Sequence, residues 1–589
     1  MKKLLRFIQS HTLLAAMAIS MAGPLSASAV TGTFAWAVET FNYPGGVVKV
    51  DNAGNVITAI RSAVNKYNSN GTPIWSASVI TLVQDIGHIV VDSANNVYVV
   101  GKGASNSVVT IGVAKISPSG AILWAKTFNL NGGGGTAEHE ASGPMVLGNN
   151  GSLYELAIGQ IVTPVTTPVT ILRINTSTGA EQNRIQMGTI TTDLSNPMQN
   201  STIALDSANN VYYGSPEGIR SYSADLQTVH WFNTQSAVRA VVCDAANNVY
   251  ATGYTTNSNG NGDYEFVVER LNNANGTPVW NDELQMGGDP INDGNNLMCR
   301  GGDAIALDSK GQIYAAGGQN INADNIVKID PTTGNIQWYT GQGGGKSADM
   351  AIAVDTYDNV YVVGTDSELD PSGKAVVYVY DPQAGDILWN QSYSLTNLGD
   401  VFNNVALDKN NGVYCIGNDN SPGAPGSGTV ENIPTLVKYT ESGLIVNGTY
   451  KIINRNSALA MEAFGAHTTN GTPIDQWAYH TGNNQQWTLT SLGGGQFSII
   501  GVQSSRSLDV ASYSTNNGAL VDLYDHNGGA NQQFSFKPTS NGYFLIIPAY
   551  IPGSCIEGKT YSTTNGTPVD LWQWQYNEGN NQQWIFQAP

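Results

Sequence analysis

The sequence has little charge, and few of its charged residues are basic. Charged residues make up 12% of the 589-residue chain, and 26 Lys plus Arg stand against 45 Asp plus Glu, for a net charge of −19. Phosphate backbones and anionic headgroups repel such a surface, so we expect neither nucleic acid nor a membrane surface as the partner. Past the N-terminal segment no run is apolar enough to span a bilayer, so we expect no membrane insertion.

The first residues have the three parts of a secretory signal. Lys2, Lys3 and Arg6 are basic, the stretch 13–18 is apolar, and Ala27-Ser28-Ala29 is a small-x-small cleavage site. We therefore expect residues 1–29 to be a signal peptide and the product to be secreted, either extracellular or periplasmic.

Cysteine is also scarce, with only Cys243, Cys299, Cys415 and Cys555. They are far apart and show no Cys-x-x-Cys spacing, which argues against a zinc site or a redox motif. Export permits a disulfide. Cys243 and Cys415 stand where sister segments carry small or apolar residues, so we favour buried free thiols and leave the disulfide status open.

What the sequence has in abundance is glycine, 66 residues, with Asn, Thr and Ser between short apolar runs. This pattern is typical of an all-β protein with many turns. The chain is too long for one ordinary core, so two or more domains are expected.

One phrase recurs eight times in the first three-quarters of the chain. It reads "VVDSANNVYVVG" at 90–101 and "ALDSKGQIYAAG" at 306–317, and its copies are on average about 51 residues apart. Each copy predicts a β-hairpin whose Asp bonds its own backbone in an Asx turn. A calcium ligand is the alternative, but the oxygen ligands are too few for a calcium loop.

A second phrase, Gly followed four residues later by Trp, comes after most of these hairpins. With the hairpin it predicts about four strands per unit, which is a propeller blade. The last unit lacks its Trp, whereas Trp36 near the N-terminus has no hairpin before it. We therefore expect eight blades, with the N-terminal strand completing the eighth and removing an exposed edge.

The segments "IDPTTGNIQW" at 329–338 and "YDPQAGDILW" at 380–389 resemble the repeats of eight-bladed quinoprotein-like propellers. The resemblance implies a β-propeller over 30–446. Quinoprotein dehydrogenases use adjacent cysteines and a calcium site beside their cofactor. This chain has neither feature, so we expect no bound cofactor and no metal.

Three further repeats follow, and they end in "GNNQQW" at 482–487, "GANQQF" at 529–534 and "GNNQQW" at 579–584. Three repeats of this length, each ending in Gln-x-aromatic, resemble the ricin-B-type lectin domain. The resemblance implies a β-trefoil over 447–589. The fold class expected for the whole chain is thus all-β, an eight-bladed β-propeller followed by a β-trefoil.

Each trefoil repeat places a first acid, a second acid, an aromatic residue and an Asn at matching offsets. Carboxylates and amides bond vicinal hydroxyls, and an aromatic ring supports the apolar face of a sugar. The resemblance implies sugar contact for the first acid, the aromatic residue and the Asn. The carbohydrate-binding candidates are Glu462, Asp475, Trp477 and Asn484; Asp509, Asp522, Tyr524 and Asn531; and Glu557, Asp570, Trp572 and Asn581.

Other residues of these repeats have structural interpretations. Trp487, Phe534 and Trp584 are expected in the core, the Gln residues before them should bond backbone across a turn, and the Asn-Gly pairs are turns. Two lobes have Glu where the family usually has Asp. The residues that lie near enough to add contacts are His480, His526 and Tyr576.

The leading hypothesis is a secreted carbohydrate-binding protein with up to three saccharide sites, whose partner is a glycan or polysaccharide. The alternative is a secreted polysaccharide-active enzyme with a catalytic propeller, and a third possibility is a protein-binding scaffold. No catalytic pair stands out, so enzyme activity stays uncertain.

The polar residues expected to line the propeller channel are His88, Arg239, Asp303, Asp349 and Asn404, and the loop residues Glu138, His139 and Glu140 are a weak metal candidate.

Overall fold

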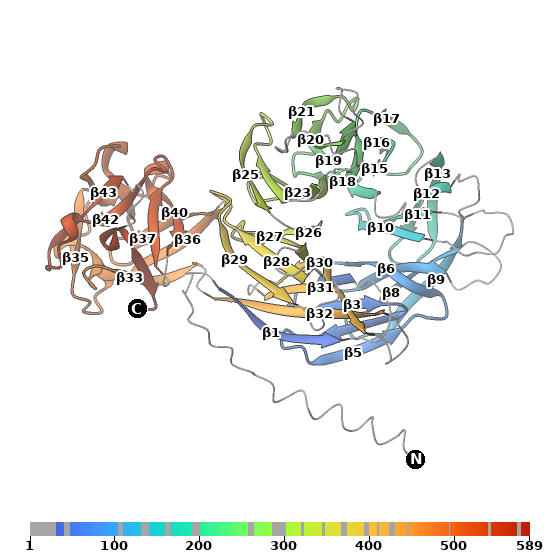
Figure 1. Cartoon of the computed structure of the whole chain (residues 1–589), viewed down its shortest axis with the longest axis horizontal. Coiled ribbons are helices and arrows are strands. Elements are labelled where there is room, and N and C mark those ends of the chain that lie inside the picture. Colours follow the sequence, from blue (N-terminus) through green and yellow to red (C-terminus); the bar gives the residue numbers. More distant parts are fainter. Residues whose placement is uncertain are drawn as a thin grey trace, which may run out of the picture.

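The computed structural model consists of two all-β domains (Figure 1). It describes residues 31–589 except for 40–46, 104–109, 131–140, 159–166, 191–200, 257–263, 285–301, 320–322, 344–347, 367–373, 394–399, 409–411, 423–429, 443–444, 446, 494, 540–542 and 574–578. The predicted signal peptide, the Glu138–Glu140 loop and Cys299 lie outside the described residues. Among the described residues, no helix has the length and apolar character that a bilayer crossing requires.

The first domain is a propeller of eight four-stranded antiparallel sheets, as predicted. Blades 1 and 2 comprise β2 (Val47–Val50), β3 (Val56–Ile60), β4 (Ala63–Tyr67), β5 (Pro73–Ser78), β6 (Val83–Val91), β7 (Val97–Gly103), β8 (Thr110–Ile116) and β9 (Ile122–Asn129). Blades 3 and 4 comprise β10 (Ala141–Leu147), β11 (Ser152–Ile158), β12 (Thr167–Asn175), β13 (Glu181–Ile190), β14 (Thr202–Leu205), β15 (Val211–Ser215), β16 (Gly218–Tyr222) and β17 (Val229–Asn233). Blades 5 and 6 comprise β18 (Ala237–Cys243), β19 (Val249–Thr256), β20 (Tyr264–Leu271), β21 (Pro278–Leu284), β22 (Gly302–Leu307), β23 (Ile313–Gln319), β24 (Ala323–Ile329) and β25 (Ile336–Gly343). Blades 7 and 8 comprise β26 (Ala348–Val354), β27 (Val360–Asp366), β28 (Lys374–Tyr380), β29 (Ile387–Tyr393), β30 (Val401–Leu407), β31 (Gly412–Pro422), β32 (Val430–Ser442) and β1 (Thr31–Glu39).

The ring is closed by the N-terminal strand. β1 pairs with β32 from Thr31 opposite Ser442 to Glu39 opposite Thr435, so it is the outer strand of blade 8. Lys438 on β32 also donates from Nζ to the carbonyl oxygen of Ser69 in blade 1, at 2.6 Å. The prediction that the N-terminal strand completes the eighth blade is therefore confirmed.

The repeated Asp stabilises the first turn of seven of the eight blades, and blade 3 has Gly148 at that position. Asp92 accepts hydrogen bonds at Oδ1 from the backbone N–H groups of Ala94 and Asn96, at 3.0 and 2.8 Å. Its Oδ2 accepts from the Tyr98 hydroxyl at 3.2 Å. Blades 4 to 8 repeat the bond between Asp and Tyr, from Tyr212 to Asp206, Tyr250 to Asp244, Tyr314 to Asp308, Tyr361 to Asp355 and Tyr414 to Asp408. These bonds confirm the Asx-turn interpretation.

The Gly-x-x-x-Trp phrase joins neighbouring blades. Trp338 of blade 6 donates from Nε1 to the Pro382 carbonyl of blade 7 at 3.2 Å, and its ring lies against Gly385. The same bond runs from Trp75 to Pro118, Trp124 to Thr176, Trp231 to Asn273 and Trp280 to Pro331. Blade 3 has Asn183 in place of Trp, and its Nδ2 donates to the Asp225 carbonyl of the next blade.

The second domain is a trefoil of three lobes. Lobe 1 contains β33 (Gly448–Asn454), β34 (Ala460–Ala463), η1 (Phe464–Ala466), β35 (Thr472–Trp477), η2 (Asn483–Gln485) and β36 (Trp487–Gly493). Lobe 2 contains β37 (Gln496–Gly501), β38 (Ser507–Val510), η3 (Ala511–Tyr513), β39 (Ala519–Tyr524), η4 (Ala530–Gln532) and β40 (Gln533–Pro538). Lobe 3 contains β41 (Phe544–Pro548), β42 (Ser554–Gly558), η5 (Lys559–Tyr561), β43 (Thr567–Gln573), η6 (Asn580–Gln582) and β44 (Trp584–Gln587). Trp487, Phe534 and Trp584 are fully buried in the core, as expected.

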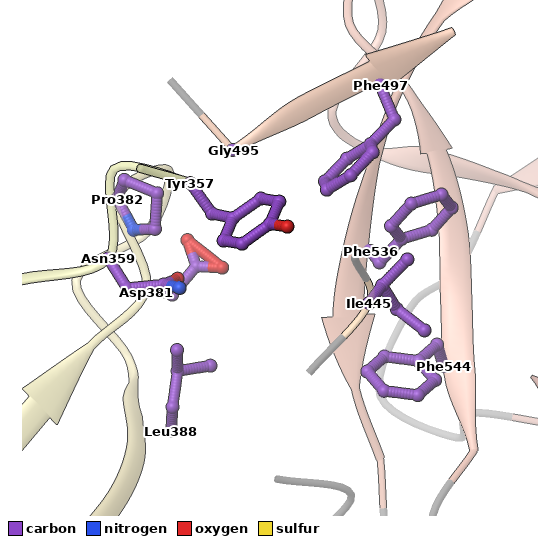
Figure 2. Close-up of a pocket in the computed structure, with 10 residues that line it drawn as sticks. All are labelled: Tyr357, Asn359, Asp381, Pro382, Leu388, Ile445, Gly495, Phe497, Phe536 and Phe544. Carbon is purple, nitrogen blue, oxygen red and sulfur yellow. The ribbon is translucent and has the colours of Figure 1, made fainter. Parts of the chain in front are cut away.

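The trefoil lies beside blades 6 and 7 of the propeller (Figure 1), where Lys537 pairs with Asp386 just before β29. The rings of Tyr357 and Phe497 stack across the interface with centroids 6.3 Å apart. Figure 2 shows Tyr357 pointing toward the aromatic side chains of the trefoil across a crevice between the two domains. Lys310 donates to Gln496 Oε1 at 3.1 Å. The apolar core is continuous across this contact, since one buried cluster includes residues of blades 7 and 8 and of the trefoil.

Two glycines allow a test of the contact between blades. Gly385 and Gly311 both have a left-handed backbone, with φ of 73° and 77°. A Cβ on Gly385 would lie 2.6 Å from Trp338, whereas one on Gly311 would meet nothing within 4 Å. We expect Gly311→Ala to cost about 1 kcal/mol from backbone strain alone. Gly385→Ala should cost about 1–3 kcal/mol more, because the tryptophan must move.

Differential scanning calorimetry of the two variants measures this difference as a larger drop in the propeller melting temperature for Gly385→Ala. Equal drops would show that the tryptophan contact adds nothing to stability beyond the turn conformation.

Candidate functional site

In the middle hairpin of each lobe, alternate side chains point toward the core and away from it. In lobe 2, Leu508 on β38 and Val521 on β39 point into the core, where both are fully buried. Successive residues of a strand face opposite sides, so Asp509, Asp522 and Tyr524 share the other face. The same alternation places the candidate acids and aromatic residue of lobes 1 and 3 together. This outer face is the candidate site.

The two acids of each lobe are directly opposite one another across the hairpin. The register pairs Glu462 with Asp475, Asp509 with Asp522 and Glu557 with Asp570. All six carboxyl groups are largely buried. Burial and the facing acid together raise the pKa of Asp475, Asp522 and Glu557 to about 7.

Amide side chains hold the first acid of each lobe by a single oxygen. Gln485 donates from Nε2 to Glu462 Oε2 at 2.9 Å. Gln532 donates to Asp509 Oδ2 at 2.8 Å, and Gln582 to Glu557 Oε2 at 3.0 Å. In the described part of the chain the other oxygen of each first acid accepts no side-chain amide, so it is available to a ligand hydroxyl.

The predicted Asn residues lie beside the same acids. Asn531 donates to Asp509 Oδ2 at 2.9 Å and to the Val510 carbonyl at 3.0 Å. Asn484 is 3.4 Å from Glu462 Oε2, and Asn581 donates to the Gly558 carbonyl at 3.0 Å. All three are nearly buried, so they shape the base of the site.

The expectation that the Gln residues bond backbone across a turn is confirmed, and the structure adds a second role. Gln485 does donate to the Ala478 carbonyl at 3.0 Å, but it also holds Glu462. The reason is that η2 passes directly over the outer face of the hairpin, which brings the amide within reach of the acid. Sequence offsets alone do not predict this approach.

The candidate aromatic residues are the open part of each site. Trp477, Tyr524 and Trp572 are 40%, 45% and 41% exposed, unlike the fully buried Trp487 and Trp584. A large ring left this open beside buried acids is a platform for an apolar ligand face. The three lobes agree in this respect.

The structure adds two features that the sequence analysis did not assign to the site. Tyr513 and Tyr561 each lie four residues after a first acid, are about half exposed, and place their hydroxyls against Gly529 and Gly579. The repeated Tyr at this offset was an available signal.

The Asn residues of the Asn-Gly turns also reach a neighbouring lobe. Asn565 of lobe 3 accepts from the Ala478 N–H of lobe 1, and Asn517 of lobe 2 from the Gln573 N–H of lobe 3, both at 2.9 Å. Both bonds fix the backbone next to a candidate tryptophan. Each of these two platforms therefore depends on two lobes.

Of the remaining predicted neighbours, His480 has its Nε2 3.5 Å from Glu462 Oε2, so it adjoins the first acid of lobe 1. His526 Nδ1 lies 3.5 Å from Ser507 Oγ at the edge of lobe 2. Tyr576 lies outside the described residues.

The channel candidates of the propeller form one ion pair. Arg239 of blade 5 pairs with Asp303 of blade 6, and both lie at bulges in the first strands of their blades. Burial and Lys49 lower the pKa of His88 to about 4. Asn404 lies on β30 opposite Ile416, and the Asp349 side chain lies outside the described residues.

The metal and cysteine predictions can be compared with the structure for the described residues. Within the described ranges, no group of three or more His, Cys, Asp or Glu side chains is placed to hold a metal ion. Cys243, Cys415 and Cys555 are free thiols.

The acid pairs predict how the trefoil responds to pH. Their folded-state pKa values are raised, so the folded trefoil holds protons that the unfolded chain releases above about pH 4. Stability is therefore full below the unfolded pKa and decreases as the pH rises through about 7. We expect the melting temperature of the trefoil to be about 2–4 °C lower at pH 8 than at pH 5.

The Asp475→Asn, Asp522→Asn double variant should reduce this difference, because it removes two of the titrating groups. Calorimetry of both proteins at the two pH values measures it. An unchanged difference in the variant would contradict the assignment of the titration to these pairs.

Comparison with known proteins finds two family models, each of which matches one part of the chain. The family described as ricin-type beta-trefoil lectin domain-like matches residues 442–524 and 483–572. The family described as outer membrane protein assembly factor BamB matches residues 264–423. No curated protein matches the chain.

Three solved structures illustrate the likeness. The designed three-fold symmetric protein ThreeFoil is 34% identical over 24% of this chain and 100% of its own, with a TM-score of 0.23. The Rhizoctonia solani agglutinin is 24% identical over 24% of this chain and 96% of its own, with a TM-score of 0.22. Quinohemoprotein alcohol dehydrogenase from Comamonas testosteroni is 11% identical over 69% of this chain and 76% of its own, with a TM-score of 0.40. The C-terminal domain thus matches the ricin-type beta-trefoil lectin domain-like family over most of its length, and the eight-bladed propeller before it matches the BamB family over about three of its blades.

Proposed function

We propose that this chain is a secreted carbohydrate-binding protein with up to three saccharide sites on its trefoil. The observation that carries the proposal is the acid, amide and exposed aromatic arrangement repeated in all three lobes. Each first acid keeps one oxygen for a ligand, and each platform ring is open beside it. A sugar offers hydroxyls and an apolar C–H face, which match these two elements.

Secretion is supported by the N-terminal sequence, with its basic start, apolar stretch and Ala27-Ser28-Ala29. Each site is shallow, so a single site should bind weakly. Three sites on one domain raise the avidity for a polymer or for a glycan-coated surface. The stacked Tyr357 and Phe497 hold the trefoil against the propeller, which keeps the propeller close to whatever the trefoil binds.

The decisive variant replaces all three platforms, as Trp477→Ala, Tyr524→Ala, Trp572→Ala. We expect it to lose glycan binding by about tenfold or more, because each ring supplies the stacking surface of its site. A glycan array followed by polysaccharide pull-down with the full chain measures the loss.

Tyr339→Ala on the propeller is the matched control, since Tyr339 is an aromatic residue 66% exposed on β25. It should leave binding unchanged. Glycan binding that survives the triple variant would place the sites elsewhere, and an intact chain that binds no glycan would refute the proposed function.

A further inference from the structure

The three lobes differ in the charge that surrounds their acid pairs. In lobe 1, His480 Nε2 lies 3.5 Å from Glu462 Oε2. In lobe 3, Lys559 Nζ lies 3.5 Å from Asp570 Oδ2. Of the Lys, Arg and His residues that the structure describes, none lies within 4.0 Å of Asp509 or Asp522 in lobe 2. Within the described structure, lobe 2 is therefore the one whose acid pair has no basic side chain within 4.0 Å.

The difference follows from a single equivalent position. η5 of lobe 3 begins with Lys559, and η3 of lobe 2 begins with Ala511. Both residues come two positions after the first acid of their lobe. Ala511 therefore brings no cationic side chain to the acid pair of lobe 2.

The acids of lobe 2 have acceptor capacity that the protein leaves unused. Asp522 is only 5% exposed, yet its Oδ1 accepts no hydrogen bond in the described structure, and the same holds for both oxygens of Asp475 and Asp570, so the lobes differ in their basic neighbours and not in this respect. Asn531 and Gln532 both donate to Oδ2 of the facing Asp509 and leave its Oδ1 unbonded. A buried acceptor without a partner costs free energy, so a ligand that brings donors and positive charge is favoured here.

Aromatic rings surround this pair. Tyr524 and Tyr513 are 45% and 50% exposed, and Tyr550 meets Tyr513 edge-on with centroids 5.4 Å apart. Tyr550 lies close enough to Asp509 for the carboxylate, after burial, to help raise its pKa to about 12. His526 lies at the Ser507 edge of the same hairpin, and Asp525, which follows Tyr524, pairs with Arg506 at 3.2 Å. Tyrosine faces beside carboxylates are the environment that proteins use to bind ammonium groups.

We propose that lobe 2 binds a protonated amino sugar, as found in a glycan that has lost its N-acetyl groups. The inference rests on the proposed function of the trefoil and specifies the ligand of one of its sites. The ammonium donates to Asp509 and Asp522, and the sugar ring lies on Tyr524. Lobe 3 does not share this preference, because Lys559 already occupies the equivalent place beside Asp570.

The test uses the full chain, with glucosamine oligomers and matched N-acetylglucosamine oligomers as probes, by titration calorimetry at about pH 6.5, where an ordinary amine is protonated. The wild type should bind the glucosamine oligomer about tenfold more tightly than the acetylated one. Ala511→Lys supplies the lobe 3 lysine to lobe 2 and should abolish that preference. Ala511→Met adds similar bulk without charge and should keep the preference.

The reciprocal variant Lys559→Ala should add a second amino-sugar site per chain, seen as increased stoichiometry. A wild type that binds both oligomers equally, or a preference that survives Ala511→Lys, would overturn the inference while the trefoil remains a lectin. A chain that is folded by calorimetry yet binds neither these oligomers nor any glycan on an array would overturn the proposed function as well.

Discussion

Antiparallel pairing between the first and last strands of each domain is the constraint on which both domains depend. In the propeller, β1 must travel from the start of the chain to β32 so that blade 8 has its fourth strand. Lys438 then reaches Ser69 and ties the last blade to the first. In the trefoil, β33 pairs with β44, so that the first strand again meets the last. In the propeller, β1 covers the edge that β32 would otherwise expose, and each blade keeps one inner and one outer edge strand.

Within those closed frames, small side-chain motifs repeat because each solves the same local problem. An Asp in every clear propeller repeat accepts hydrogen bonds from backbone N–H groups of its own turn. A Trp donates a hydrogen bond to a backbone carbonyl of the next blade. The trefoil repeats an acid, an amide and an aromatic residue on the outer face of each hairpin. The repeats differ in charge at one equivalent position, which is Ala511 in lobe 2 and Lys559 in lobe 3.

Much of this was predictable because the interactions are local or periodic. The Asx role of Asp92 depends on residues within six positions, and the N-terminal closure follows from counting Trp36 against the unit that lacks a tryptophan. The fold class and the burial of Trp487, Phe534 and Trp584 were likewise predictable from repetition. The hydrogen bond from Gln485 to Glu462 was not predictable, because 23 positions separate the two residues and only the path of η2 brings them together.

The sequence by itself determined the number of blades and lobes and which residue types each lobe presents, since strand period and turn chemistry are written in neighbouring residues. Only the tertiary structure decided that the two acids of a lobe face each other, that Asn565 completes the platform of another lobe, and that Tyr357 stacks on Phe497 between the domains. These contacts join residues far apart in the chain. Their geometry depends on how closed sheets twist and pack, which residue spacing does not encode.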